Sequence, residues 1–318
     1  MPLALLLSCT REPAAPTDAT SDPGSEPVDS TVPSTGPFDL YDDPPYDCAA
    51  GVPPGPFAPT TLSRVVTTED LAFDLDGWLV ASDLAGNLLR YDAAGNLAVW
   101  VPNLANTRGI DLLPDGAVVL SNETLAQLTR IDPASAAATS IAPTGASPAG
   151  IDVAADGTVY VGDLASGGVF EVTPAGDVTA LWPPSSTFVQ AYGVALSVDE
   201  QTLYAAPFND RALYRLVRDP AGGWRAPDRW VKLPQHLLTG VAVDACDQLY
   251  VLGADCHVYR IDPATEGVET LTELPVPGQF CANLAFGRAV GGWDPYSLYV
   301  TTYDDVVRLE IGVPGRPR

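Results

Sequence analysis

Apolar and polar residues alternate along residues 149–177, and turn residues interrupt the alternation at regular places. The segments 150–153, 158–161 and 169–172 each follow the two-residue period of a strand. Asp156-Gly157 and Gly167-Gly168 separate these segments and favour tight turns. No helical periodicity lies between them. The stretch therefore predicts a small antiparallel sheet.

The same unit recurs along the chain at intervals of about 40 residues. The first apolar residues of the six copies are Leu71, Ile110, Ile151, Val194, Val241 and Leu284. Several short strands per repeat at this period are typical of propeller blades. A β-sandwich has similar turn spacing, but its strands do not repeat in sequence. We therefore predict an all-β fold, a six-bladed β-propeller.

The sixth copy lacks a fourth strand. Its three strands are expected at 282–287, 298–302 and 306–311, and only residues 312–318 follow them. Thr61–Val66 has the pattern of a strand but precedes the first blade. We predict that this strand is the outer strand of the sixth blade and closes the ring, because closure removes an exposed sheet edge.

Composition adds a strong acidic bias. The 318 residues include 40 Asp and Glu against 16 Lys and Arg, for a formal net charge of −24. Such a surface repels nucleic acid and anionic membranes. Because repeated blades cannot bury their faces alone, we predict one domain over residues 58–318. We expect it to be a monomer.

The N-terminus predicts export. Residues 1–9 resemble the end of a bacterial lipoprotein signal peptide, in which Leu6-Leu7-Ser8-Cys9 is the lipobox and Cys9 is acylated. A basic n-region is missing, and the alternative is that Cys9 is an unpaired thiol. Residues 10–57 are rich in Pro, Ser, Thr and Asp, a composition that favours a disordered linker or tether. We expect a lipid-anchored protein of the bacterial cell envelope, with no other membrane contact.

Four further cysteines suit an oxidising compartment. Cys246 and Cys256 lie in turns on opposite rims of one predicted blade, about 15 Å apart, which is too far for a disulfide. Cys281 enters the next blade from the rim that carries Cys256. We therefore predict the disulfides Cys256–Cys281 and Cys48–Cys246, with reduced thiols as the alternative.

Motifs of known catalytic sites are missing from the sequence. It contains no Gly-x-Ser-x-Gly, His-Glu-x-x-His, Cys-x-x-Cys or phosphate loop. His236 lies in the loop that enters the fifth blade, near the predicted channel mouth. It is suited to acid or base chemistry, but the simpler interpretation is a surface histidine.

The blades resemble the SMP-30/gluconolactonase family, and they are similar to NHL repeats. The resemblance covers about residues 69–311 and rests on segments such as Leu238-Thr239-Gly240-Val241, Tyr259-Arg260-Ile261-Asp262-Pro263 and Arg211-Ala212-Leu213-Tyr214-Arg215-Leu216. It implies a calcium-dependent lactone hydrolase, in which a divalent cation polarises the lactone carbonyl and activates water.

The resemblance also implies where a cation would bind. In the family pattern the ligands stand two residues before the aligned apolar position. The residues there are Glu69, Arg108, Ala149, Tyr192, Thr239 and Ala282. Only Glu69 retains a carboxylate, and we expect Arg108 to pair with it. Calcium needs six or more oxygens, so Glu69 is a metal ligand only if a cation binds at all.

We therefore favour a binding or interaction domain without a cofactor over an enzyme. The channel mouth, with Glu69, Arg108, Tyr192, Thr239 and His236, is the predicted binding surface for a small molecule or an envelope protein. The alternative is the calcium-dependent lactone hydrolase that the family resemblance implies.

Overall fold

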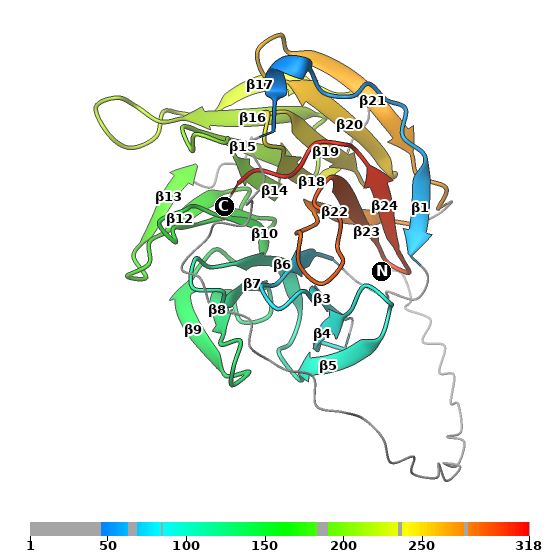
Figure 1. The fold of residues 1–318 in the computed structure, drawn as a ribbon. Coiled ribbons are helices and arrows are strands. Elements are labelled where there is room, and N and C mark those ends of the chain that lie inside the picture. Colours follow the sequence, from blue (N-terminus) through cyan, green and yellow to red (C-terminus); the bar gives the residue numbers. More distant parts are fainter. Residues whose placement is uncertain are drawn as a thin grey trace, which may run out of the picture. The chain divides into compact units, whose positions relative to one another are not determined.

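The computed structural model is an all-β propeller (Figure 1). It describes residues 46–62, 69–83, 85–182, 190–234, 237–276 and 279–317. Six four-stranded antiparallel sheets, the blades, make up this part of the chain. The predicted lipobox with Cys9 and the linker up to residue 45 lie outside the described residues, as does His236.

The first three blades are continuous in sequence, and each runs from an inner to an outer strand. Blade one is β2 (Leu71–Phe73), β3 (Leu79–Ser82), β4 (Leu88–Tyr91) and β5 (Leu97–Val101). Blade two is β6 (Thr107–Leu112), β7 (Val118–Asn122), β8 (Gln127–Ile131) and β9 (Ala138–Pro143). Blade three is β10 (Pro148–Val153), β11 (Val159–Asp163), β12 (Val169–Val172) and β13 (Val178–Trp182).

The last three blades follow the same order, except that the outer strand of blade six comes from the N-terminal side. Blade four is β14 (Ala191–Leu196), β15 (Thr202–Pro207), β16 (Ala212–Val217) and β17 (Asp228–Lys232). Blade five is β18 (Leu238–Val243), β19 (Leu249–Gly253), β20 (His257–Asp262) and β21 (Gly267–Glu273). Blade six is β22 (Cys281–Phe286), β23 (Ser297–Thr302), β24 (Val306–Glu310) and β1 (Pro59–Leu62).

Acidic side chains form the turns between the first and second strands. In blade one the Asp74 carboxylate accepts hydrogen bonds from the backbone of Asp76 at 3.0 Å and of Trp78 at 2.8 Å. Gly77 has a φ of 86°, which a residue with a side chain adopts only under strain. The sequence Asp74-Leu75-Asp76-Gly77 therefore forms a turn that the Asp74 side chain stabilises.

The core lies between neighbouring blades. One buried cluster joins Ala72, Val80 and Leu88 of blade one to Leu112 and Val118 of blade two. Hydroxyl groups also join neighbouring blades near the channel. They donate to backbone carbonyls, from Ser82 to Thr107 at 3.3 Å, from Ser121 to Ala149 at 2.6 Å and from Thr301 to Glu69 at 3.3 Å.

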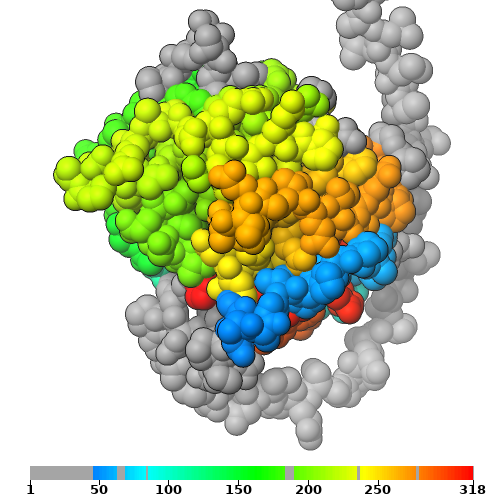
Figure 2. All heavy atoms as spheres, turned by 90° about the horizontal axis from the view of Figure 1, so that it is seen from above, coloured from blue at the N-terminus to red at the C-terminus, as the bar shows by residue number. Residues whose placement is uncertain are grey.

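The N-terminal strand closes the ring as the sequence predicts. β1 pairs antiparallel with β24, with Thr60 opposite Arg308 and Thr61 opposite Val307. It begins two residues before the predicted Thr61–Val66, whose last four residues lie outside the described part of the chain. In space-filling Figure 2 the blue residues 46–62, which include β1, lie beside the orange residues of blade five.

Residues 46–57 pack on the propeller, so the predicted linker boundary at residue 57 is too late. Tyr46, Val52 and Phe57 contact the buried cluster of blades five and six. The Arg260 guanidinium donates to the Pro53 carbonyl at 2.7 Å. Composition misplaced this boundary because a Pro-rich segment can still pack when a disulfide and backbone hydrogen bonds hold it. A 3-10 helix, η1 (Cys48–Ala50), lies in the same segment.

Both predicted disulfides are present. Cys48 is joined to Cys246, with the Cα atoms 5.4 Å apart, and Cys256 to Cys281, with the Cα atoms 5.1 Å apart. Each disulfide joins cysteines on the same rim of the propeller, as expected when successive strands of a blade alternate in direction. No helix within the described ranges is long and apolar enough to cross a bilayer.

Candidate binding site at the channel mouth

The inner strands β2, β6, β10, β14, β18 and β22 line the central channel and run in one direction. We call the end where they begin the channel mouth and the other the far end. Position −2 from the aligned apolar residue therefore places Glu69, Arg108 and Tyr192 at the mouth. The side chains at the mouth form three sets of contacts: an ion network, a hydrogen bond across the channel and a row of aromatic rings.

An ion network crosses the mouth from blade one to blade two. The Arg108 guanidinium lies 3.1 Å from Glu69 Oε1 and 2.9 Å from Glu123 Oε2. The Ser147 hydroxyl of the next blade donates to Glu123 Oε1 at 2.7 Å. The side chain of Arg108 is 20% exposed and that of Glu69 is 11% exposed. The expected Glu69–Arg108 pair therefore exists, and it is part of a chain of three charges.

These contacts change proton affinities. Burial lowers the pKa of the Arg108 guanidinium, but the charge of Glu69 and the bond to Glu123 raise it above its ordinary value. Burial raises the pKa of Glu123, whereas the bonds from Arg108 and Ser147 lower it below its usual range. Both groups are thus charged at neutral pH.

A hydrogen bond joins blade four to blade one across the channel. The Tyr192 hydroxyl donates to Glu69 Oε2, so Arg108 and Tyr192 occupy the two oxygens of this carboxylate. Burial, and after it the charge of Glu69, raises the pKa of Tyr192 well above its ordinary value. The phenol therefore stays protonated and remains a donor.

Aromatic rings continue from Tyr192 around the mouth. Tyr192 stacks on Phe208 with centroids 5.9 Å apart, Phe208 lies 6.0 Å from Phe280, and Phe280 stacks on Tyr303 at 5.1 Å. Tyr303 is 39% exposed. We call these four residues the aromatic row. Tyr303 lies two residues after Thr301, whose hydroxyl donates to the Glu69 carbonyl at 3.3 Å. Burial and then the charge of Glu69 raise the pKa of Tyr303.

Thr239 is not part of this network. It is fully buried, and its hydroxyl donates to the carbonyls of Cys281 at 3.0 Å and Leu252 at 3.3 Å. Its side chain joins blades five and six in the way that Ser121 joins blades two and three. Of the predicted mouth residues, Glu69, Arg108 and Tyr192 come together.

The site residues that were not predicted include Phe280 and Ser147, each directly before an inner strand. Three others stand at one equivalent position, three residues after the aligned residue of the second strand: Glu123, Phe208 and Tyr303. Once the strand register is known, the repeat identifies this position, because a position that faces the channel in one blade does so in the others.

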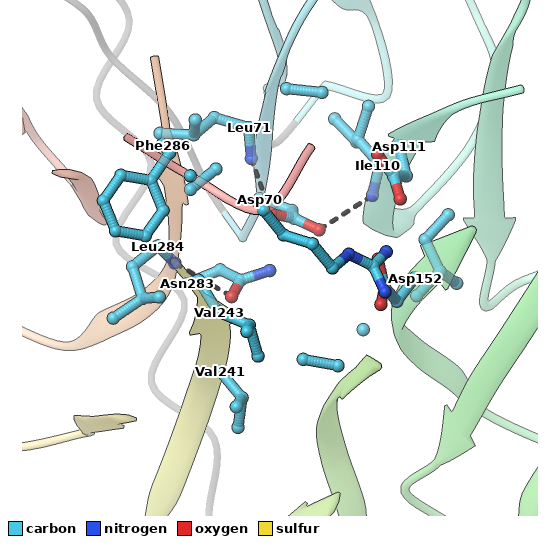
Figure 3. A pocket seen from close by; sticks show the side chains of 18 of the residues that line it. Asp70, Leu71, Ile110, Asp111, Asp152, Val241, Val243, Asn283, Leu284 and Phe286 are labelled. Atoms are coloured by element: carbon cyan, nitrogen blue, oxygen red, sulfur yellow. Dashed lines mark hydrogen bonds and ion pairs between the residues drawn. The ribbon is translucent and has the colours of Figure 1, made fainter. Parts of the chain in front are cut away.

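Deeper in the channel, three carboxylates line a cavity of about 120 Å³ (Figure 3). Asp70 accepts from the backbone N–H of Ile110 at 2.8 Å, and Asp111 from that of Val153 at 3.0 Å. Asp152 accepts from Leu196 at 2.6 Å. Each carboxylate thus bonds to the backbone of a neighbouring blade, and burial raises the pKa of Asp70 well above its ordinary value.

The mouth does not fit a calcium ion. Calcium takes six to eight oxygen ligands, several of them carboxylates. Both oxygens of Glu69 face donors, and Arg108 brings a fixed positive charge against the same group. Among the described residues, no group of three His, Cys, Asp or Glu side chains is placed to hold a metal.

Comparison with protein-family models gives no match, and none is found among curated proteins. Solved structures do match. A gluconolactonase of Xanthomonas campestris is 23% identical over 89% of this chain and 99% of its own, with a TM-score of 0.66. Regucalcin, a calcium-binding protein of Agrobacterium tumefaciens, is 19% identical over 82% and 96%, with a TM-score of 0.67.

An auxiliary nutrient-binding protein of Bacteroides thetaiotaomicron shares the architecture at 11% identity, over 77% of this chain and 69% of its own, with a TM-score of 0.62. At these identities the similarity shows the fold alone. The fold class is the six-bladed β-propeller. Its arrangement is that of the gluconolactonase and regucalcin structures, as the sequence resemblance predicted.

Proposed function

We propose that the protein binds a small polyhydroxylated molecule at the channel mouth without a divalent cation. The observation that carries this proposal is the occupation of Glu69 by Arg108 and Tyr192. An internal guanidinium stands where a cation-dependent site needs an open carboxylate. The proposal agrees with the sequence-based expectation of a binding domain.

The chemistry of the mouth supports the ligand class. Carboxylates accept hydrogen bonds from hydroxyl groups, and a guanidinium donates to them in a fixed geometry. The exposed ring of Tyr303 lies beside these charges and offers an apolar face, against which the C–H face of a sugar-like ring can pack. Concave sites with few polar groups beside aromatic walls are typical of small-ligand binding.

Calorimetry with a panel of neutral sugars and sugar acids tests the proposal. We expect binding that is equal in calcium and in chelator, and at least tenfold weaker in Tyr303→Ala and Arg108→Gln. Arg225→Gln is the matched control, because Arg225 pairs with Asp219 on the surface of blade four. Absence of binding to every member of the panel, or equal binding by all variants, contradicts the proposal.

A calcium-dependent lactone hydrolase is the second candidate, favoured by the shared architecture with gluconolactonase. It requires a cation to displace Arg108 from Glu69. Hydrolysis of a simple sugar lactone, followed with and without calcium, separates the two. We expect no calcium-dependent turnover; turnover that is lost in Glu69→Gln, with micromolar calcium binding, establishes the enzyme instead.

We also propose export to an oxidising compartment, with lipid attachment at Cys9. Two disulfides in the propeller support the first part, because cytosolic thiols stay reduced. Mass spectrometry of the N-terminal peptide from a bacterial host tests the second. We expect a diacylglycerol adduct that is lost in Cys9→Ser; an unmodified Cys9 thiol contradicts it.

A further inference from the structure

The chain does not end at its last strand. β24 finishes at Glu310, and residues 312–317, which we call the C-terminal strap, cross the far end of the channel. Figure 1 shows the red chain running from β24 to the C label near the centre of the ring. Ile311 and Val313 are fully buried and anchor the start of the strap in the cluster of blades five and six.

The strap lies along the inner strand of blade five as a short added strand. Ala245 donates its N–H to the Pro314 carbonyl at 2.9 Å, and Arg316 donates its own N–H to the Val243 carbonyl at 2.9 Å. Gly315 forms a bridge with Asp244. A Cβ atom at Gly315 would lie 2.5 Å from that of Phe286, so the close approach requires glycine.

Arg316 reaches from blade five to blades three and four. Its guanidinium lies 3.0 Å from Asp152 Oδ1, and it donates to the carbonyls of Val153 at 3.1 Å and Ser197 at 3.4 Å. The residue is 8% exposed. Asp152 is one of the three carboxylates of the central cavity, and the strap residues Gly315 and Arg316 line that cavity too.

We propose that the far end of the channel is a binding site for an extended, arginine-containing peptide, which the chain fills with its own C-terminal strap. The strap is thus a plug at the far end, beside the central cavity that Gly315 and Arg316 line. Two backbone hydrogen bonds give register, the pocket beside Phe286 selects glycine, and Asp152 selects the guanidinium. This inference does not depend on the ligand proposed for the mouth.

The energetic argument rests on burial of the Arg316–Asp152 pair. Both side chains are at most 5% exposed, and a buried carboxylate without its partner is strongly destabilised. An arginine at this position is therefore needed whenever the site is filled. A peptide without it gains the same backbone bonds but leaves Asp152 without the guanidinium.

A peptide added in trans tests the site. The chain is ended after Val313, which keeps both apolar anchors, and is titrated with the N-acetylated peptide Pro-Gly-Arg-Pro, the sequence of residues 314–317. We expect binding to the shortened chain, at least tenfold weaker binding of the peptide with alanine for arginine, and no binding to the intact chain. Lack of binding by a shortened chain whose near-ultraviolet circular dichroism is native overturns the proposal.

Access to the cavity gives a second measurement in the full chain, which serves if the shortened chain does not fold. Ala242→Cys places a thiol on the cavity wall beside Val243. We expect a water-soluble thiol reagent to label it at least tenfold faster when Arg316→Gln is added, but not when the surface change Arg225→Gln is added. The chain with Ala242→Cys alone gives the reference rate. Equal labelling rates in this chain and in the two double variants contradict the proposal.

Discussion

Tyr192 on blade four and Glu69 on blade one share a hydrogen bond across the channel, although 123 positions separate them in sequence. The bond ties opposite parts of the ring at the mouth. We expect Tyr192→Phe to lower the free energy of unfolding by about 1 to 2 kcal/mol, because a buried carboxylate loses a donor. Urea unfolding measures this change.

A double-mutant cycle with Glu69→Gln isolates the pair. A coupling of about 0.5 to 3 kcal/mol is the expected range for residues in direct contact. Tyr214→Phe is the matched control, since the Tyr214 hydroxyl donates to Asp210 at 3.0 Å on the outer part of blade four. If the effects of the two single substitutions on the free energy of unfolding add up in the double variant, Tyr192 and Glu69 are not in contact. In a separate binding measurement, an effect of Tyr214→Phe on ligand affinity contradicts the location of the site.

Asp244 gives the fold a defined dependence on pH. Burial raises its pKa to about 6, despite hydrogen bonds from Gln248, Tyr250 and Cys246. The native state therefore holds a proton that the unfolded state has lost between pH 4 and 6. Its contribution to the free energy of unfolding decreases as the pH rises through this window, by up to about 3 kcal/mol.

Asp244→Asn tests this sign. The variant keeps an acceptor for the backbone but cannot titrate, so the difference between its stability and that of the parent should vary between pH 4 and 6 and become constant above pH 7. Other carboxylates titrate in both proteins and cancel in the difference. A difference that stays constant from pH 4 to 7 refutes the raised pKa.

The two disulfides should contribute unequally. Cys48–Cys246 spans 198 residues and Cys256–Cys281 spans 25. The chain-entropy model gives about 5 and about 3.5 kcal/mol for loops of these lengths. We expect the double variant Cys48→Ser, Cys246→Ser to unfold at lower urea than Cys256→Ser, Cys281→Ser; the reverse order would show that native contacts around the bonds dominate.

Ring closure by β1 predicts an alternating effect of proline. In an antiparallel pair, neighbouring residues alternate between an N–H that faces the partner strand and one that faces away. Of Thr60→Pro and Thr61→Pro, one should therefore cost about 1 to 3 kcal/mol and the other less. Thermal unfolding of both variants decides this. If neither changes the melting temperature, β1 does not stabilise the ring.

The sequence predicted the fold because every blade repeats the same apolar positions. It also predicted that Arg108 pairs with Glu69, because equivalent positions on neighbouring inner strands converge on the channel. Thr239 occupies the same position, yet its hydroxyl bonds to backbone carbonyls. A short polar side chain at such a position can hydrogen-bond to nearby backbone carbonyls and not point into the channel. The spacing of residues in the sequence does not distinguish these two cases.

The aromatic row and the strap could not be predicted from the sequence, for two different reasons. Phe208 and Tyr303 follow second strands in turns of unequal length, so their equivalence emerges only once the strand register is known. The strap has no strand periodicity, and its partner Asp152 lies 164 positions earlier. Contacts of this kind depend on how the closed ring brings distant segments together.

Both ends of the described chain are fastened to one turn of blade five. Cys246 carries the disulfide to Cys48, and the adjacent Ala245 donates to Pro314 of the strap. Tension applied to the residues before Cys48 would therefore reach the inner part of blade five through covalent bonds and would bypass the hydrogen bonds between β1 and β24. A propeller fastened in this way can be pulled from its N-terminus without unzipping its closure.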